Sequence, residues 1–317
     1  MITTPSVNVT YLLFTLLIAF VILSFHLQGG LERITKYMMS ALIVLMLVLA
    51  VHSFTLPGAG EGLSFYLIPH FSKITGSVVV GAMNQAFFTL SVGMGGMAIF
   101  GSYIGKERTL TGEAVSVTLL DTLVAFMAGL IIFPACFAYN IEAKSGPSLI
   151  FITLPNVFNH MAGGRIWGTL FFLFMSFAAF STIIAVFQNI ISFATDLTGC
   201  TLKKAVLCNI AAIIILSLPC VLGFNLWSSF APLGEGSTVL DLEDFILSNN
   251  LLPIGSMLYL LFCTSRYGWG FKKFMAEANE GEGIHFPAWT RVYVSYILPL
   301  IVLIIFIQGY ASKFLGN

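Results

Sequence analysis

Asp121 is the only acidic residue well inside an apolar stretch of this sequence. It lies between Leu119-Leu120 and Thr122-Leu123. A carboxyl group in an apolar membrane interior is costly unless it faces a partner, a cavity or a cation. The position favours a functional carboxylate, with a structural, hydrogen-bonded Asp as the alternative.

A second candidate site combines Ala178, Ser181 and Thr182. At positions i, i+3 and i+4 of a helix these residues share one face. Two hydroxyls and a nearby carbonyl offer hard oxygen ligands, which suit a small hard cation. Hydroxyl groups also bond the carbonyls of their own helix, and taken alone the pattern favours that second interpretation.

The segment 88–97 (FTLSVGMGGM) carries Gly93, Gly95 and Gly96 at the centre of a long apolar stretch. Glycine weakens a helix, so the segment is a candidate break. A broken membrane helix exposes backbone N–H and C=O groups, which are tolerated only where they line a cavity. There the half-helix ends favour ions. Close helix packing through small residues is the other interpretation, and the glycines alone do not decide between them.

The elements that position these residues follow from composition. The chain has 317 residues, of which 58% are hydrophobic and only 9% charged; soluble domains carry about 25% charged residues. Fourteen basic and fourteen acidic side chains cancel, which gives no reason to expect a nucleic-acid partner. About 20 apolar residues span a bilayer as a helix. The sequence therefore predicts an all-α integral membrane protein with apolar helices at 10–27, 37–56, 76–104, 114–139, 165–194, 205–223, 245–264 and 290–310. The third and fifth are longer than a bilayer needs, so we expect them to tilt, bend or break.

The remaining reactive residue types show no catalytic pattern. The five cysteines lack metal-type spacing, the histidines are scattered singly, and we find no catalytic dyad or nucleophile motif. We therefore predict that the chain is not an enzyme and has no enzymatic cofactor. Nothing resembles the charged ring or filter of a channel. Asp196 and Asp244 stand at the ends of apolar stretches, where acidic side chains are usually solvated.

Basic residues predict the orientation of the chain. Cytoplasmic loops carry the excess of Lys and Arg. Ten basic residues lie in one set of loops and four in the other: Arg33, Lys36, Lys106, Arg108, Lys203, Lys204, Arg266, Lys272, Lys273 and Arg291 against Lys73, Lys144, Arg165 and Lys313. Both termini are then expected outside, which predicts an odd number of preceding helices. A native first helix with its N-terminus outside is the alternative.

Four ordered motifs resemble the neurotransmitter:sodium symporter family, and the likeness covers essentially the whole chain. They are residues 85–95 (QAFFTLSVGMG) with 101–103 (GSY), 119–123 (LLDTL) with 128–134 (AGLIIFP), 151–155 (FITLP) through 162–164 (AGG), and 177–182 (FAAFST) through Gln188. The resemblance implies the inverted-repeat, leucine-transporter-like fold, with the eight stretches matching its helices 4–11. That architecture comes with the resemblance and not from the residue pattern. The family's first three helices have no counterpart here, and the missing twelfth is ordinary in bacterial members.

The resemblance also implies roles for individual residues. One sodium site would include Thr89 and Asp121, and a second would include Ala178 (through its carbonyl), Ser181 and Thr182. Asp244 and Asp196 would be the acidic halves of the outer and inner gates. The family sites also need ligands from helices one to three. The substrate pocket would be lined by Phe88, Ser91, Met94, Thr182 and Val186.

These likenesses imply a function as well. We expect sodium-coupled symport of an amino acid or related small amine across the bacterial inner (plasma) membrane. Because Asp121 stands where chloride-dependent members have Asn, chloride is expected not to be required. A separate N-terminal fragment supplying helices one to three is a possible partner. The alternative is a non-transporting remnant or membrane interaction protein.

Within a single transmembrane domain of residues 1–317, the first repeat would end in 1–75, the second would occupy 76–272, and the final helix 273–317.

Overall fold

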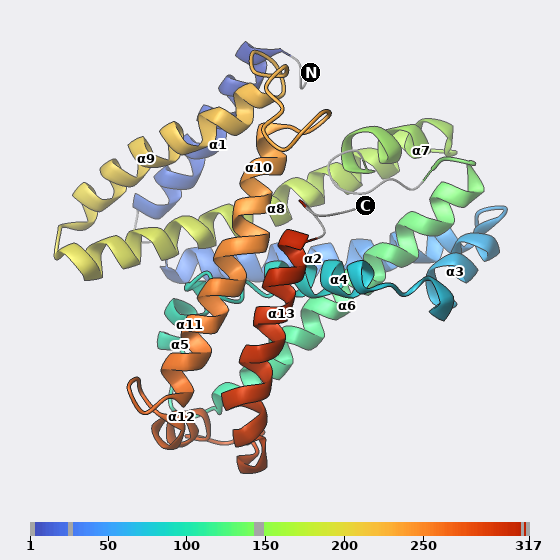
Figure 1. Ribbon diagram of the computed structural model, residues 1–317. Helices are drawn as coiled ribbons and strands as arrows, with labels where there is room; N and C mark the ends of the chain where they lie inside the picture. Colours follow the sequence, from blue (N-terminus) through green and yellow to red (C-terminus); the bar gives the residue numbers. More distant parts are fainter. Residues whose placement is uncertain (1–3, 25–27, 143–148, 312–313, 315–317) are drawn as a thin grey trace. The chain divides into compact units, whose positions relative to one another are not determined.

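The computed structural model describes residues 4–24, 28–142, 149–311 and 314, and the described parts of all eight predicted stretches are largely helical (Figure 1). The end of the first predicted stretch (25–27), the loop residue Lys144 and the C-terminal Lys313 lie outside the described residues. The α-helices are α1 Pro5–Ser24, α2 Gln28–Phe54, α3 Ala59–Leu67, α4 Gly76–Thr89, α5 Gly96–Ser102, α6 Leu110–Ala138, α7 Leu154–His160, α8 Gly164–Thr198, α9 Leu202–Gly223, α10 Val239–Ile246, α11 Leu252–Thr264, α12 Phe271–Ala278 and α13 Leu298–Tyr310.

Among the described residues, five helices are long and apolar enough to cross a membrane. They are Leu110–Ala138, Gly164–Thr198, Leu202–Gly223, Val239–Thr264 and Ala288–Tyr310. A sixth span results if α2 and α3, which are bent by 117° at their junction, are counted together. The third predicted stretch is divided between α4 and α5, whereas the fifth remains the continuous, 35-residue helix α8.

Three π-helical turns precede prolines in the same way. The turns are Leu149–Thr153, Leu247–Leu251 and Tyr293–Ile297, and a proline follows each one two residues later, at Pro155, Pro253 and Pro299. Proline lacks an N–H and its ring clashes with the carbonyl four residues before it, which here lies inside the π-turn. The wider turn relieves that clash and lets the helix continue.

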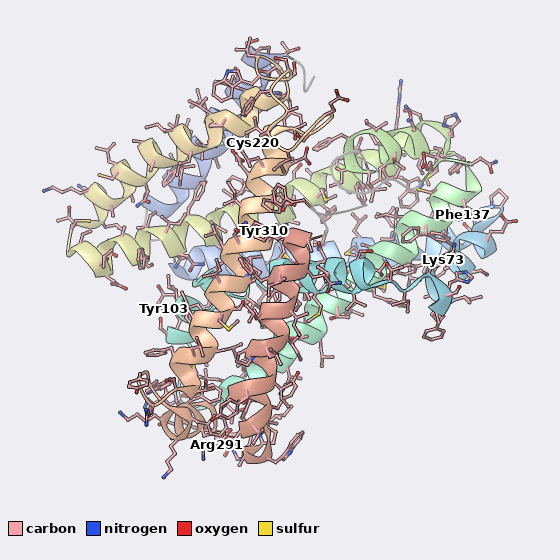
Figure 2. The ribbon with its side chains drawn as sticks, in the orientation of Figure 1. Lys73, Tyr103, Phe137, Cys220, Arg291 and Tyr310 are labelled. Carbon is pink, nitrogen blue, oxygen red and sulfur yellow. The ribbon has the colours of Figure 1, made fainter. Side chains whose placement is uncertain are left out.

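The chain forms two compact units, which are described separately. Unit 2 comprises residues 21–73 and 120–185. Its core is a buried apolar cluster from the end of α6 and from α7, with three aromatic side chains of α8 packed against it. In the same unit α3 packs on α6, where the ring of Phe65 lies 5.3 Å from that of Phe137, which is labelled in Figure 2.

Unit 1 comprises residues 1–20, 74–119 and 186–317. Within it α11 and α13 lie side by side, and α4 contacts both of them (Figure 1). Arg291, labelled in Figure 2, places its guanidinium 5.8 Å from the ring centre of Phe271 at the start of α12.

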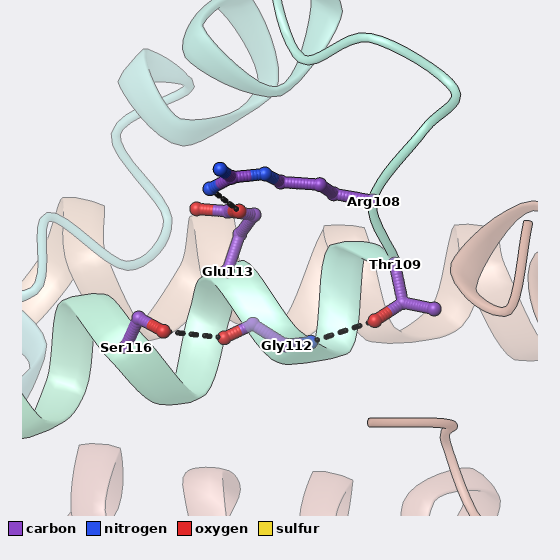
Figure 3. Close-up of polar contacts among 5 residues, drawn as sticks. All are labelled: Arg108, Thr109, Gly112, Glu113 and Ser116. Atoms are coloured by element: carbon purple, nitrogen blue, oxygen red, sulfur yellow. Dashed lines mark hydrogen bonds and ion pairs between the residues drawn. The ribbon is translucent and has the colours of Figure 1, made fainter. Parts of the chain in front are cut away.

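Polar contacts hold the part of the α5–α6 loop that leads into α6. Figure 3 shows the start of α6, where the buried Thr109 hydroxyl accepts a hydrogen bond from the Gly112 N–H at 3.2 Å, and Arg108 pairs with Glu113 at 3.1 Å. Lys106 pairs with Glu280, just beyond α12, at 3.1 Å. The hydrogen bond to that carboxylate and its charge raise the pKa of Lys106 above its ordinary value of 10.5.

Candidate substrate and ion site

The predicted break between α4 and α5 is confirmed. Helix α4 ends at Thr89, α5 begins at Gly96, and three residues between them have left-handed backbone angles: Ser91 at φ 52°, Gly93 at 88° and Gly95 at 84°. A side chain at positive φ is strained, which makes Ser91 unusual in this segment. The unwound segment 90–95 turns backbone groups away from the helical ladder, as a ligand site requires.

The same glycines also pack closely, so the two interpretations left open by the sequence hold together. Gly93 lies against the Leu252 carbonyl and Ser256 of α11, and a Cβ on Gly255 would overlap the Gly93 carbonyl oxygen. The hydroxyl of Tyr259 lies near Gly95. Residues 252, 255, 256 and 259 form one face of α11 by their i, i+3, i+4, i+7 spacing. This face supports the unwound segment.

Phe88, Ser91 and Met94 are brought together by the end of α4 and the unwound segment. Ser91 is half-buried, and its N–H donates to the Phe88 carbonyl at 3.1 Å. The side chains of Phe88 and Met94 are 44% and 43% exposed, which leaves them available to a ligand. An apolar ring, a flexible thioether and several glycines form a wall suited to an apolar side chain.

Three oxygen atoms converge on one face of α8, in unit 2. Ser181 Oγ donates to the Ala178 carbonyl at 2.8 Å, and Thr182 Oγ1 donates to the same carbonyl at 3.2 Å. The alternative interpretation, hydroxyls bonded to their own helix, thus describes the structure. These hydrogen bonds also hold the three oxygens close together, as a cation site needs. Rotation of either hydroxyl would turn its lone pairs outward, toward a cation. The chemistry of the three oxygens fits a hard cation.

The remaining predicted ligand residues lie on α4, α6 and α8. Asp121 is half-buried on α6 and belongs to unit 2, whereas Thr89 is the last residue of α4 and belongs to unit 1. Val186 lies one turn after Thr182 on α8, and both residues are exposed. The pairing of Thr89 with Asp121, and of the α8 residues with Phe88, stays a prediction.

The two gate residues occupy exposed positions. Asp196 lies near the end of α8, and Asp244 in α10 accepts a hydrogen bond from Ser248 Oγ at 2.9 Å. Their roles as gates also stay predictions.

A polar group in the seventh predicted stretch is not among the residues predicted from the sequence. Asn249 Oδ1 accepts a hydrogen bond from Asn84 Nδ2 of α4 at 3.0 Å, and the Tyr310 hydroxyl donates to Asn250 Oδ1. Figure 2 labels Tyr310 on α13. Three consecutive polar residues, 248–250, within an apolar stretch were the available signal.

A multi-pass helical chain that contains a broken helix, with the unwound segment packed on a neighbouring helix, has the construction of a secondary transporter. The chain belongs to the Sodium:neurotransmitter symporter family, whose model matches residues 3–314. This is a family of transporters and not of enzymes, and membership makes the chain a multi-pass membrane protein. The family is named for sodium symport.

Related proteins agree with this assignment. The chain is 33% identical over 309 residues to an uncharacterized sodium-dependent transporter of Haemophilus influenzae, covering 96% of this chain and 66% of the relative. It is 27% identical to the sodium-dependent serotonin transporter of Drosophila melanogaster, covering 94% and 49%.

A solved structure confirms the fold class. The crystal structure of MhsT in complex with L-phenylalanine superimposes with a TM-score of 0.85 at 33% identity, covering 97% of this chain and 69% of that one. The inverted-repeat symporter fold expected from the sequence is therefore the fold of this chain. The chain spans about half to two thirds of the length of the curated relatives above.

Proposed function

We propose that this protein takes part in sodium-coupled symport of an amino acid or related small amine across the plasma membrane. The unwound segment 90–95, with Ser91 and two glycines at positive φ, is the observation that supports this most strongly. Backbone groups freed at mid-membrane can bind the charged main chain of an amino acid. Phe88 and Met94 beside them offer apolar contact to its side chain.

Sodium is the proposed coupling ion at two sites. Ala178, Ser181 and Thr182 contribute three converging oxygens to one of them. Asp121 and Thr89 contribute to the other and, because Asp121 stands where chloride-dependent members of the family have Asn, chloride is not required. Asp244 and Asp196 act as the acidic sides of the outer and inner gates.

The proposed substrate is an amino acid with a large apolar or aromatic side chain. MhsT, whose fold this chain shares, was crystallised with L-phenylalanine. Met94 is exposed and flexible, and the glycines around it carry no side chains. Together they leave space for a large substrate side chain.

The resemblance assigns further ligands to the family's helices one to three, and a separate fragment supplying them is a proposed partner. Uptake by this chain alone, without co-expression of such a fragment, would show that no partner is needed. The proposed organisation has the first repeat ending in 1–75, the second repeat in 76–272 and the final helix in 273–317, in a bacterial inner membrane.

The test is uptake of radiolabelled L-phenylalanine into membrane vesicles from cells expressing the protein, under an inward sodium or potassium gradient. We expect uptake with sodium only, and its loss in Asp121→Ala at equal amounts of protein in the membrane. Equal uptake in both gradients, for wild type and variant, would instead support a non-transporting remnant.

A further inference from the structure

The π-turn Leu247–Leu251 directs polar side chains toward two neighbouring helices of unit 1. The side chain of Asn249 accepts a hydrogen bond from Asn84 Nδ2 of α4 at 3.0 Å. Its neighbour Asn250 contacts α13 through the Tyr310 hydroxyl and donates to the Phe245 carbonyl at 3.1 Å. Consecutive residues of one turn thus connect to different helices, which a π-turn permits by shifting the register of the helix faces.

The Asn84–Asn249 contact is a half-buried polar contact in a membrane span. Asn84 Oδ1 is buried, and no donor among the described residues reaches it. On α13, Gly309 leaves the contact room, since a Cβ there would lie 2.8 Å from Asn249 Oδ1. An apolar pair of the same shape would be at least as stable as a partly satisfied polar pair. Helix packing alone therefore does not explain why two amides face each other here.

The position of Asn84 on α4 connects this contact to the ligand site. Phe88 follows Asn84 by four residues and shares its helix face, and Thr89 is the next residue. Beyond them, Gly93 is held against Gly255 and Ser256 of α11. The last turn of α4 is thus fixed on both sides, by a directional hydrogen bond before it and by backbone packing after it.

We propose that Asn249 is a positioning residue for transport, which acts through Asn84 to set the register of the last turn of α4 and so the placement of Phe88 and Thr89. This inference rests on the proposed function, because it assigns Asn249 to the sodium and substrate site argued above. Asn249 itself touches neither ligand.

The test compares Asn249→Leu, which keeps the volume but removes the acceptor, with Asn249→Asp, which keeps the acceptor for Asn84 Nδ2. The readouts are the sodium and L-phenylalanine concentrations at half-maximal uptake, measured in vesicles and normalised to protein in the membrane. Asn249→Leu should raise both by about fivefold, the effect of one lost hydrogen bond, and Asn249→Asp should restore wild-type values. The double variant with Asn84→Leu should be no worse than either single variant, because all three lack the same bond.

Asn250→Leu is the matched control, since it removes polar contacts of the same turn to α13 and not to α4. It should lower the amount of protein in the membrane without changing either half-saturating concentration. Equal shifts in Asn250→Leu and Asn249→Leu, or no shift in Asn249→Leu, overturn the positioning role while sodium-dependent uptake by the wild type still supports symport. Wild-type uptake that ignores sodium overturns both. If Asn249→Leu does not reach the membrane, Asn84→Leu decides the question in the same assay.

Discussion

The hydroxyls of Ser181 and Thr182 serve two purposes in this account. Each donates to the Ala178 carbonyl, and each can turn a lone pair toward a cation. Ser181→Ala and Thr182→Ala should each raise the half-saturating sodium concentration on the order of tenfold, because a contact to a charged group contributes about 1.5–3 kcal/mol. Thr182→Ser should keep the wild-type value.

Ser176 provides a control on the same helix. Its hydroxyl donates to the Phe172 carbonyl at 2.7 Å, so it makes the same kind of helix contact outside the proposed site. Ser176→Ala should leave the sodium requirement unchanged. A similar shift in all three alanine variants would indicate a general effect on α8 and would argue against a sodium site there.

Asp121 carries the second prediction at the residue scale. If its fixed charge balances a bound sodium ion, Asp121→Asn leaves the ion without a compensating charge, and an added anion can replace it. Uptake by Asp121→Asn should then become chloride-dependent, while wild-type uptake is the same in chloride and in gluconate. A chloride requirement in the wild type would contradict this role.

Asp121, Ser181 and Thr182 could be predicted from the sequence because they are polar residues within apolar stretches. A carboxylate or paired hydroxyls within an apolar stretch need an explanation, whatever the fold. Asn84 was missed because its significance depends on Asn249, 165 positions away. No local pattern encodes such a pairing.

At the scale of elements, the contact between the unwound segment and α11 depends on the absence of side chains. A Cβ on Gly255 would overlap the Gly93 carbonyl, whereas Gly81 on α4 has open space around it. Gly255→Ala should destabilise the protein by about 1–3 kcal/mol, as overpacking does, and should reduce uptake. Gly81→Ala should stabilise it by about 0.5–1 kcal/mol, because alanine favours the helix.

Thermal unfolding in detergent and uptake in vesicles measure the two effects. The contrast between the two substitutions matters, since both replace glycine by alanine in the same unit of the fold. Similar behaviour of the two variants would mean that the glycine contact does not hold the unwound segment in place.

The helix break and the π-turns differ in how far the sequence predicts them. The glycines made the third stretch a candidate for a break, because glycine weakens a helix, and left close helix packing as the alternative. The π-turns before Pro253 and Pro299 were not predicted. A proline indicates an irregularity in a helix. Packing against neighbouring helices determines whether that irregularity is a kink or a π-turn.

For the whole molecule, composition predicted the class and the resemblance predicted the fold. Low charge and long apolar stretches require a membrane protein, since a soluble chain could not cover such surface with polar groups. The inverted repeat could not be read from hydropathy, because α-helices of either repeat have the same apolar composition. The resemblance to the symporter family supplied that expectation, and the match with MhsT confirms the fold class.

In the proposed function, sodium entry drives accumulation of the amino acid. The most direct measurement is the steady-state ratio of internal to external labelled L-phenylalanine in proteoliposomes, across a series of inward sodium gradients. Sodium-coupled symport should give a ratio that rises above one with the gradient and returns to one when sodium is equal on both sides. A ratio of one at every gradient would contradict it.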